Sequence, residues 1–146
     1  MAFEIRSELH IHARPEKVWT ILTDFENYPK WNPFIKSLQG EVKIGNRIIA
    51  RIEPPKASGM TFKPIVLTFE ENKEFSWLGH LWFTGLFDGE HKFELIDQGD
   101  GTILFIQREK FKGILLPLLK NQLQNNAKRG FEEMNLKIKE LAERND

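Results

Sequence analysis

The sequence predicts an α+β fold, in which a curved antiparallel sheet of about seven strands wraps around one long C-terminal helix. Three observations lead to this fold class: a stretch of alternating apolar and polar residues near the start, turn signals every eight to fifteen residues through the middle, and one long amphipathic stripe after Gly113. An antiparallel sheet needs one face covered, and only that helix is long and apolar enough to cover it. The chain of 146 residues is expected to form a single domain, residues 1–146.

The first elements are expected to be a strand and a short helix. Apolar residues alternate with polar ones over residues 3–11, which is typical of a half-buried strand. Pro15 then suits a first helical turn, and apolar residues from Val18 to Phe25 keep helical spacing.

The stretch DFENYPKWNPFI, residues 24–35, holds four aromatic residues and two prolines. Because Pro29 and Pro33 interrupt the first helical pattern, a second short helical turn that carries Tyr28 and Trp31 is expected, and the next strand is expected to start at Phe34. The density of aromatic residues favours a plug at one end of the sheet, with Trp31 and Phe34 facing inward.

The middle of the chain is expected to be a meander of antiparallel strands. Glycine, proline and asparagine pairs separate short runs rich in β-branched and aromatic residues. The predicted strands are RIIARIE (47–53), FKPIVLTFE (62–70), FSWLGHLWF (75–83), EHKFELI (90–96) and TILFIQREKF (102–111). The loop between the last two, QGDGT, suits a hairpin with Gly101 in the left-handed conformation.

The last third of the chain predicts one long helix that begins near Pro117. Apolar or small residues recur there at steps of three and four. The stripe comprises Leu116, Leu119, Leu123, Ala127, Gly130 or Phe131, Met134, Ile138 and Leu141.

Composition excludes several function classes. The 21 basic residues balance the 21 acidic ones, and the pI is near 6.9, so the chain lacks the basic excess of a nucleic-acid-binding protein. It has no cysteine, hence no disulfide and no thiolate nucleophile. The start of the chain shows no signal peptide, and no segment is apolar over the roughly 20 residues of a membrane span. A cytoplasmic protein without membrane insertion is the expectation.

The whole chain resembles the START-like, or Bet v 1-like (SRPBCC), superfamily, and within it the bacterial polyketide cyclase/dehydrase and lipid transport branch. The resemblance lies in ARPEKVWTILTDFENYPKWNPFI (13–35), GEHKFELIDQGDGTILFIQREKFKGILLPLL (89–119) and GFEEMNLKIKEL (130–141). It implies a helix-grip fold with an apolar cavity between sheet and helix. It implies little about chemistry, because this fold hosts carriers, receptors, cyclases and chaperone activators.

The predicted hairpin places three polar residues on one face. If Gln98 pairs with Thr102, His91 lies opposite Glu109, and Gln107 lies on the same face beside the apolar side chains. Three interpretations remain open for the cluster of His91, Gln107 and Glu109: an anchor for the polar end of an apolar ligand, a hydrogen-bonded structural pair, and an acid/base dyad of His91 and Glu109.

The remaining cavity residues are expected to be apolar. Seventeen residues of the chain are aromatic, twelve of them Phe, enough to line a cavity of about 300–1,000 Å³. The predicted lining comprises Trp31, Phe34, Phe62, Trp77, Phe83, Phe93, Phe105, Leu119, Leu123, Ala127 and Phe131, and the segment GILLPLL (113–119) is the predicted gate. Small residues at Ala127 and Gly130 either leave room for a ligand or let the helix approach the sheet closely.

These patterns favour a protein that binds a small hydrophobic or amphipathic ligand, such as a lipid, polyketide or aromatic compound, as carrier or sensor. A polyketide cyclase or aromatase using His91 and Glu109 is the first alternative, and a protein-interaction module of the chaperone-activator type is the second. No cofactor and no metal are expected: His10 and His12 share a strand face, but no third ligand lies beside them in the sequence. The expected assembly is a monomer or weak homodimer.

Overall fold

The computed structural model describes residues 2–55 and 57–144 and has the α+β architecture that the sequence predicts. Its strands are β1 (Ala2–Ile11), β2 (Ile35–Gln39), β3 (Ile49–Ile52), β4 (Met60–Phe62), β5 (Ile65–Glu70), β6 (Glu74–His80), β7 (Asp88–Asp97) and β8 (Ile103–Lys112). Its helices are α1 (Pro15–Leu22), a 3-10 turn (Phe25–Asn27), α2 (Tyr28–Trp31), α3 (Leu116–Gln122), a π-type segment (Leu123–Ala127) and α4 (Lys128–Ala142).

The strands form two antiparallel sheets rather than one continuous sheet. The larger has the order β1-β8-β7-β6-β5, and the smaller has the order β2-β3-β4. An isolated bridge between Arg47 and Ile65 links them. The predicted strand 62–70 breaks in two because Pro64 has no backbone N–H for a ladder.

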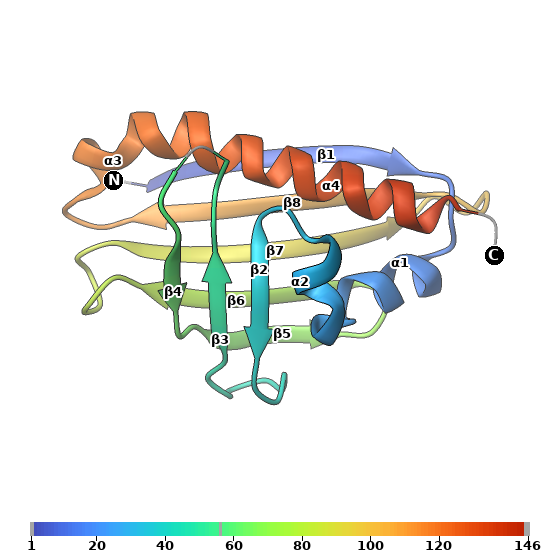
Figure 1. Cartoon of the computed structure of the whole chain (residues 1–146), viewed down its shortest axis with the longest axis horizontal. Coiled ribbons are helices and arrows are strands. Elements are labelled where there is room, and N and C mark those ends of the chain that lie inside the picture. Colours follow the sequence, from blue (N-terminus) through green and yellow to red (C-terminus); the bar gives the residue numbers. More distant parts are fainter. Residues whose placement is uncertain (1, 56, 145–146) are drawn as a thin grey trace.

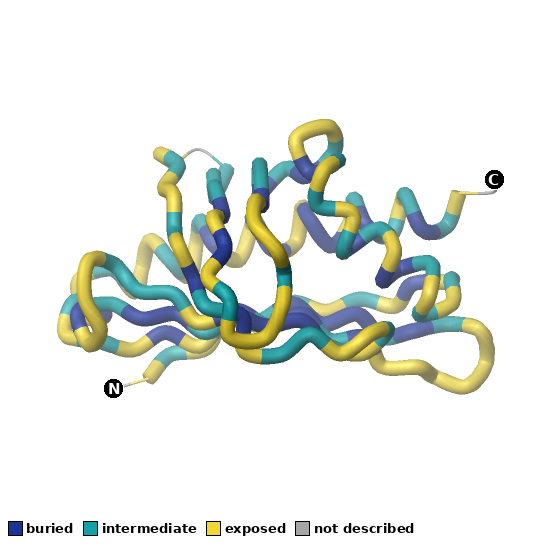
Figure 2. The backbone as a smooth tube through the Cα atoms, turned by 90° about the horizontal axis from the view of Figure 1, so that it is seen from below, coloured by how far each residue is buried: buried dark blue, intermediate teal, exposed yellow. Residues whose placement is uncertain are grey.

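The smaller sheet and the helices lie on the same side of the larger sheet. Figure 1 shows β2, β3 and β4 crossing the long strands, with α3 and α4 running above β1 and β8. Figure 2 shows buried residues recurring along the strands of the larger sheet and along the segments that pack over it. The helix-grip arrangement is therefore confirmed: the two sheets enclose the C-terminal helix from below and from one side.

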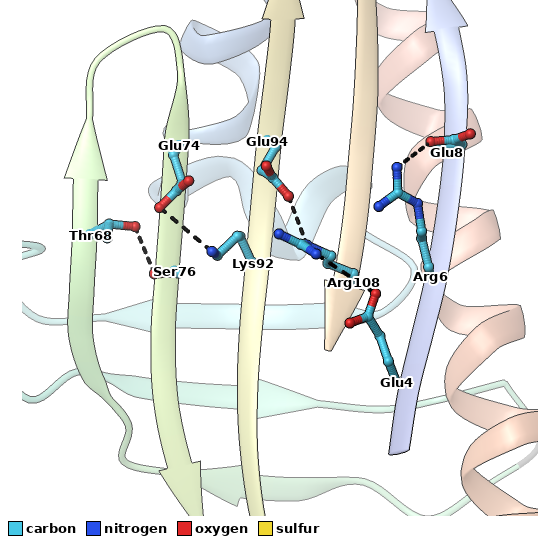
Figure 3. A network of polar contacts seen from close by, with 9 residues as sticks. All are labelled: Glu4, Arg6, Glu8, Thr68, Glu74, Ser76, Lys92, Glu94 and Arg108. Atoms are coloured by element: carbon cyan, nitrogen blue, oxygen red, sulfur yellow. Dashed lines mark hydrogen bonds and ion pairs between the residues drawn. The ribbon is translucent and has the colours of Figure 1, made fainter. Parts of the chain in front are cut away.

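The outer face of the larger sheet carries charged residues, as strand alternation requires. Arg108 on β8 contacts Glu94 on β7 at 2.7 Å and Glu4 on β1 at 3.8 Å, and Lys92 lies 4.0 Å from Glu74 (Figure 3). The inner residues of the same strands are thereby directed toward the helix, where the candidate site lies.

The only tyrosine of the chain, Tyr28, is the first residue of α2 and is fully buried. Its hydroxyl donates a hydrogen bond to the carbonyl of Leu22. Burial, and to a lesser extent the nearby Asp24 carboxylate, raise the pKa of Tyr28 far above its usual range.

We expect Tyr28 to stay protonated in the folded protein at pH values where a free tyrosine ionises. Because the folded state holds this proton above the ordinary pKa of about 10, the stability contributed by Tyr28 is full below that pH and falls as pH rises further. The tyrosinate ultraviolet absorbance should appear only as the protein unfolds. Tyrosinate forming near pH 10, while circular dichroism still reports a folded chain, would contradict this.

Candidate ligand-binding site

A pocket of about 300 Å³ opens between the two sheets and the start of the C-terminal helix. The larger sheet forms its floor, β3 and β4 form one wall, and α3 with the π-type segment covers it. Its lining comprises Phe34, Ile52, Pro54, Ala57, Ser58, Met60, Phe62, Trp77, Gly79, Leu81, Phe87, Gly89, Glu109, Phe111, Leu119, Gln122, Leu123, Asn126 and Ala127.

Glu109 is the only ionisable side chain among these lining residues. Its carboxylate lies over Gly89 on the neighbouring strand, where a Cβ atom would collide with Glu109 Oε2. The glycine therefore provides the space in which the carboxylate reaches the pocket.

Behind Glu109, a chain of hydrogen bonds runs through the core. His91 Nδ1 lies 3.1 Å from Glu109 Oε1, and His91 Nε2 lies 2.9 Å from Gln107 Oε1. Gln107 Nε2 donates to Asn135 Oδ1 on α4 at 2.7 Å, and Asn135 Nδ2 donates to Ser7 Oγ on β1 at 3.2 Å. The chain thus ties three strands of the larger sheet to the C-terminal helix.

The directions of these bonds locate the protons of His91. Gln107 Nε2 also points to the backbone carbonyl of Phe131, at 3.5 Å, which only accepts, so Gln107 Oε1 is the atom that faces His91. His91 Nε2 must then carry a hydrogen. The contact between His91 Nδ1 and Glu109 Oε1 needs one further proton, which gives either an imidazolium beside a carboxylate or a neutral ring beside a protonated carboxyl.

Aromatic rings enclose His91 completely. Trp77 stacks on it with ring centroids 4.9 Å apart, Phe93 lies at 4.8 Å, and Phe131 approaches edge-on at 5.0 Å. With both ring nitrogens bonded and no exposed surface, His91 meets the pocket only through Glu109.

The predicted site residues divide into three groups. Seven of them line the pocket: Phe34, Phe62, Trp77, Glu109, Leu119, Leu123 and Ala127. Five are fully buried in the core behind it: His91, Phe93, Phe105, Gln107 and Phe131. Their burial follows from close packing, since these inner-face residues contact one another rather than the cavity.

The third group, Phe83 and Trp31, lies outside the pocket. Phe83 is 57% exposed, because β6 ends at His80 and the chain turns at Trp82, so strand alternation no longer directs Phe83 inward. Trp31 packs edge-on against Tyr28, at 5.3 Å, and against the hydrophobic core, so α2 places it within the packing of the two short helices rather than beside this pocket.

Asn135 is the polar core residue that the sequence analysis missed. It follows Phe131 by one helical turn and so belongs to the buried stripe of α4, where it is 1% exposed. A polar residue on an apolar stripe signals a buried hydrogen-bond partner, and this signal was present in the sequence.

The two small residues of the helix have different roles. Gly130 lets the ring of Phe34 pack directly on α4, since a Cβ atom there would collide with that ring. Ala127, in contrast, borders the pocket. The small size of Gly130 is therefore explained by the close approach of Phe34 to the helix, whereas the small size of Ala127 is compatible with room for a ligand.

Among the described residues, no group of three or more His, Cys, Asp or Glu side chains is placed to hold a metal ion. His10 on β1 and His12 just after it are both exposed.

Fold and site together define a helix-grip protein with a partly apolar internal pocket. The chain belongs to the polyketide cyclase / dehydrase and lipid transport family, whose sequence model matches residues 2–143. No curated protein sequence matches the chain.

Solved structures of the same fold share little sequence with the chain. The Zhui aromatase/cyclase from Streptomyces sp. R1128 is 11% identical with a TM-score of 0.78, over 99% of this chain and 95% of that one. A START superfamily protein from Mycobacterium smegmatis is 19% identical with a TM-score of 0.70, over 94% and 98%. The di-domain ARO/CYC StfQ of the steffimycin pathway is 13% identical with a TM-score of 0.78; 98% of this chain matches, but it spans only 52% of StfQ, about half its length.

Proposed function

We propose that the protein binds a compact, mostly apolar molecule carrying one hydrogen-bond donor, and that it acts as a carrier or sensor of that molecule. The observation that carries this proposal is a single carboxyl, Glu109, in a pocket otherwise lined by apolar and uncharged polar residues. With Oε1 facing His91, Oε2 is available to accept a hydrogen bond from a ligand. The volume, about 300 Å³, lies at the small end for ligand pockets and suits a ring compound better than a long-chain lipid.

The polar anchor can be tested with two probes that differ only in the donor, 2-naphthol and 2-methoxynaphthalene. We expect wild-type protein to bind the naphthol roughly tenfold more tightly by calorimetry, because a hydrogen bond to a charged group contributes about 1.5–3 kcal/mol. Glu109→Leu should remove this preference and keep binding of the methoxy compound.

Glu90→Leu is the matched control, because Glu90 precedes His91 on β7 and so points to the outer face. It should keep the preference for naphthol. Equal affinity of wild-type protein for both probes would refute the anchor. Failure to bind either probe, together with a ligand-free mass of protein purified from its own host, would refute the binding function itself.

A cyclase-type enzyme is the second candidate, favoured by the proton held between His91 and Glu109. In that case Glu109 is the group that contacts the substrate. His91, on the side of Glu109 away from the pocket, orients its carboxyl group and exchanges a proton with it. His91→Phe distinguishes the two: loss of turnover of a polyketide-like substrate with binding retained supports the enzyme, and absence of turnover in wild-type protein supports the carrier.

A further inference from the structure

Two loops join at the end of the molecule where α3 begins (Figure 1). The backbone N–H of Ile114 donates to the carbonyl of Gly85 at 3.1 Å, and that of Leu115 donates to Leu86 at 3.0 Å. The loop between β6 and β7 is therefore held against the segment between β8 and α3. This junction lies beside the pocket, because Leu81 and Phe87 from the first loop and Leu119 from α3 line it.

The same segments expose large apolar side chains to solvent. Trp82 is 82% exposed, Leu118 79% and Ile114 74%, the three most exposed large hydrophobic residues of the described chain, and Phe83 from the same loop is 57% exposed. Trp82 also has a positive φ of 63°, a conformation that residues other than glycine rarely adopt. We call Trp82, Phe83, Ile114 and Leu118 the apolar tip.

Positive charge predominates in the segments that carry the apolar tip, although the whole chain is neutral. Residues 110–131 carry Lys110, Lys112, Lys120, Lys128 and Arg129 and no acidic residue, and residues 79–87 carry no Asp, Glu, Lys or Arg. Nearby carboxylates offset only part of this charge. In the strand register Glu4 and Glu90 lie across from Lys110, and Asp88, which accepts a hydrogen bond from the Gly85 amide, lies across from Lys112. The three remaining cations, Lys120, Lys128 and Arg129, are exposed.

We propose that the apolar tip docks in the interfacial region of a bilayer that contains anionic lipids. The four side chains of the apolar tip are too few to bury the roughly 800 Å² per partner that a stable protein interface requires. Trp, Phe, Leu and Ile flanked by lysines are instead the side chains that enter a membrane interface, where each nearby cation adds attraction to anionic headgroups. No helix of the described residues is long and apolar enough to cross a membrane, so the contact is a shallow one.

Docking in this way places the pocket end of the molecule against the bilayer. Leu81 and Phe87 of the first loop and Leu119 of α3 line the pocket. The neighbouring side chains of the apolar tip enter the membrane, so a membrane-dissolved ligand reaches the pocket without crossing water. The docking depends on the apolar tip and its cations alone, and it is therefore separable from the proposed ligand binding.

Co-sedimentation with phosphatidylcholine vesicles, with and without phosphatidylglycerol, tests the proposal. We expect wild-type protein to bind the anionic vesicles, to lose binding as salt is raised, and to show a blue shift of tryptophan fluorescence that the Trp82→Ser change removes. The double variant Trp82→Ser/Leu118→Ser should lower partitioning at least tenfold. Lys120→Gln should lower it about fivefold.

Leu136→Ser is the matched control, because Leu136 is 60% exposed on α4, away from the apolar tip. It should bind vesicles like wild-type protein. All these residues are exposed, so thermal unfolding should confirm that each variant folds. Equal partitioning of wild-type protein and the double variant would overturn the proposal. A concentration-dependent dimer in sedimentation equilibrium that the double variant abolishes would also overturn it, since a second copy would then cover the tip.

Discussion

We expect Gln107→Leu to lower the free energy of unfolding by about 3 kcal/mol, although leucine matches glutamine closely in volume. The substitution leaves His91 Nε2 and Asn135 Oδ1 without partners in a fully buried region, and each such group costs roughly 1–3 kcal/mol. Chemical denaturation monitored by circular dichroism measures the loss.

Two further variants distinguish the loss of hydrogen-bond partners from a general disturbance of core packing. Ser7→Ala removes the last acceptor of the same chain at a half-buried position, and we expect it to cost less than about 1 kcal/mol. Asn135→Leu combined with Gln107→Leu removes the stranded Asn135 oxygen, so the double variant should be more stable than the sum of the two single losses predicts. Strict additivity of the two losses would contradict the coupled chain.

The hairpin of β7 and β8 shows what local sequence can predict. The GDG loop fixes the register through a short connection: Gln98 N donates to Thr102 O, Gly101 has a φ of +86°, and His91 lies opposite Glu109 as predicted. Strand alternation then carries the register along the whole hairpin, which is why the polar cluster of the site was predicted without a structure.

Residues whose position depends on distant contacts could not be predicted in this way. Alternation alone extends β6 through Phe83, but the chain turns at Trp82 in a conformation that its side chain does not favour and that no local signal announces. The separation of five predicted site residues from the pocket, among them Phe93 and Phe131, depends on how the helix packs on the sheet. Likewise, the π-type segment at Leu123–Ala127 interrupts a stripe that the sequence presents as one regular helix.

The gate prediction for residues 113–119 gains a structural basis but stays a prediction. Leu116 is buried, Leu119 lines the pocket, and Ile114 and Leu118 point outward. A segment with such mixed exposure can open only if the backbone bonds between Ile114, Leu115 and the opposite loop break. The glycine that permits this junction is therefore the most informative position to change.

Gly113→Ala should destabilise the protein by about 3 kcal/mol and open this junction. Gly113 has a φ of +134°, a region that is strained for any residue with a side chain and costs roughly 1–3 kcal/mol. A Cβ atom would also lie 2.5 Å from the carbonyl oxygen of Leu86 and 2.8 Å from the Cα of Phe87, both backbone atoms that cannot rotate away. The two loops must therefore move apart.

Gly99→Ala separates backbone strain from collision. Gly99 has a φ of +79°, and a Cβ atom there would meet nothing within 4 Å, so its substitution should cost only about 1 kcal/mol. Hydrogen exchange supplies the second measurement: the amides of Ile114 and Leu115 should exchange faster in Gly113→Ala, because their acceptors lie on the displaced loop, and should be unchanged in Gly99→Ala. Equal losses of stability in the two variants, with both amides still protected, would contradict this prediction. The two loops would then accommodate a side chain at position 113 without separating, and their hydrogen bonds would not be what keeps residues 113–119 closed.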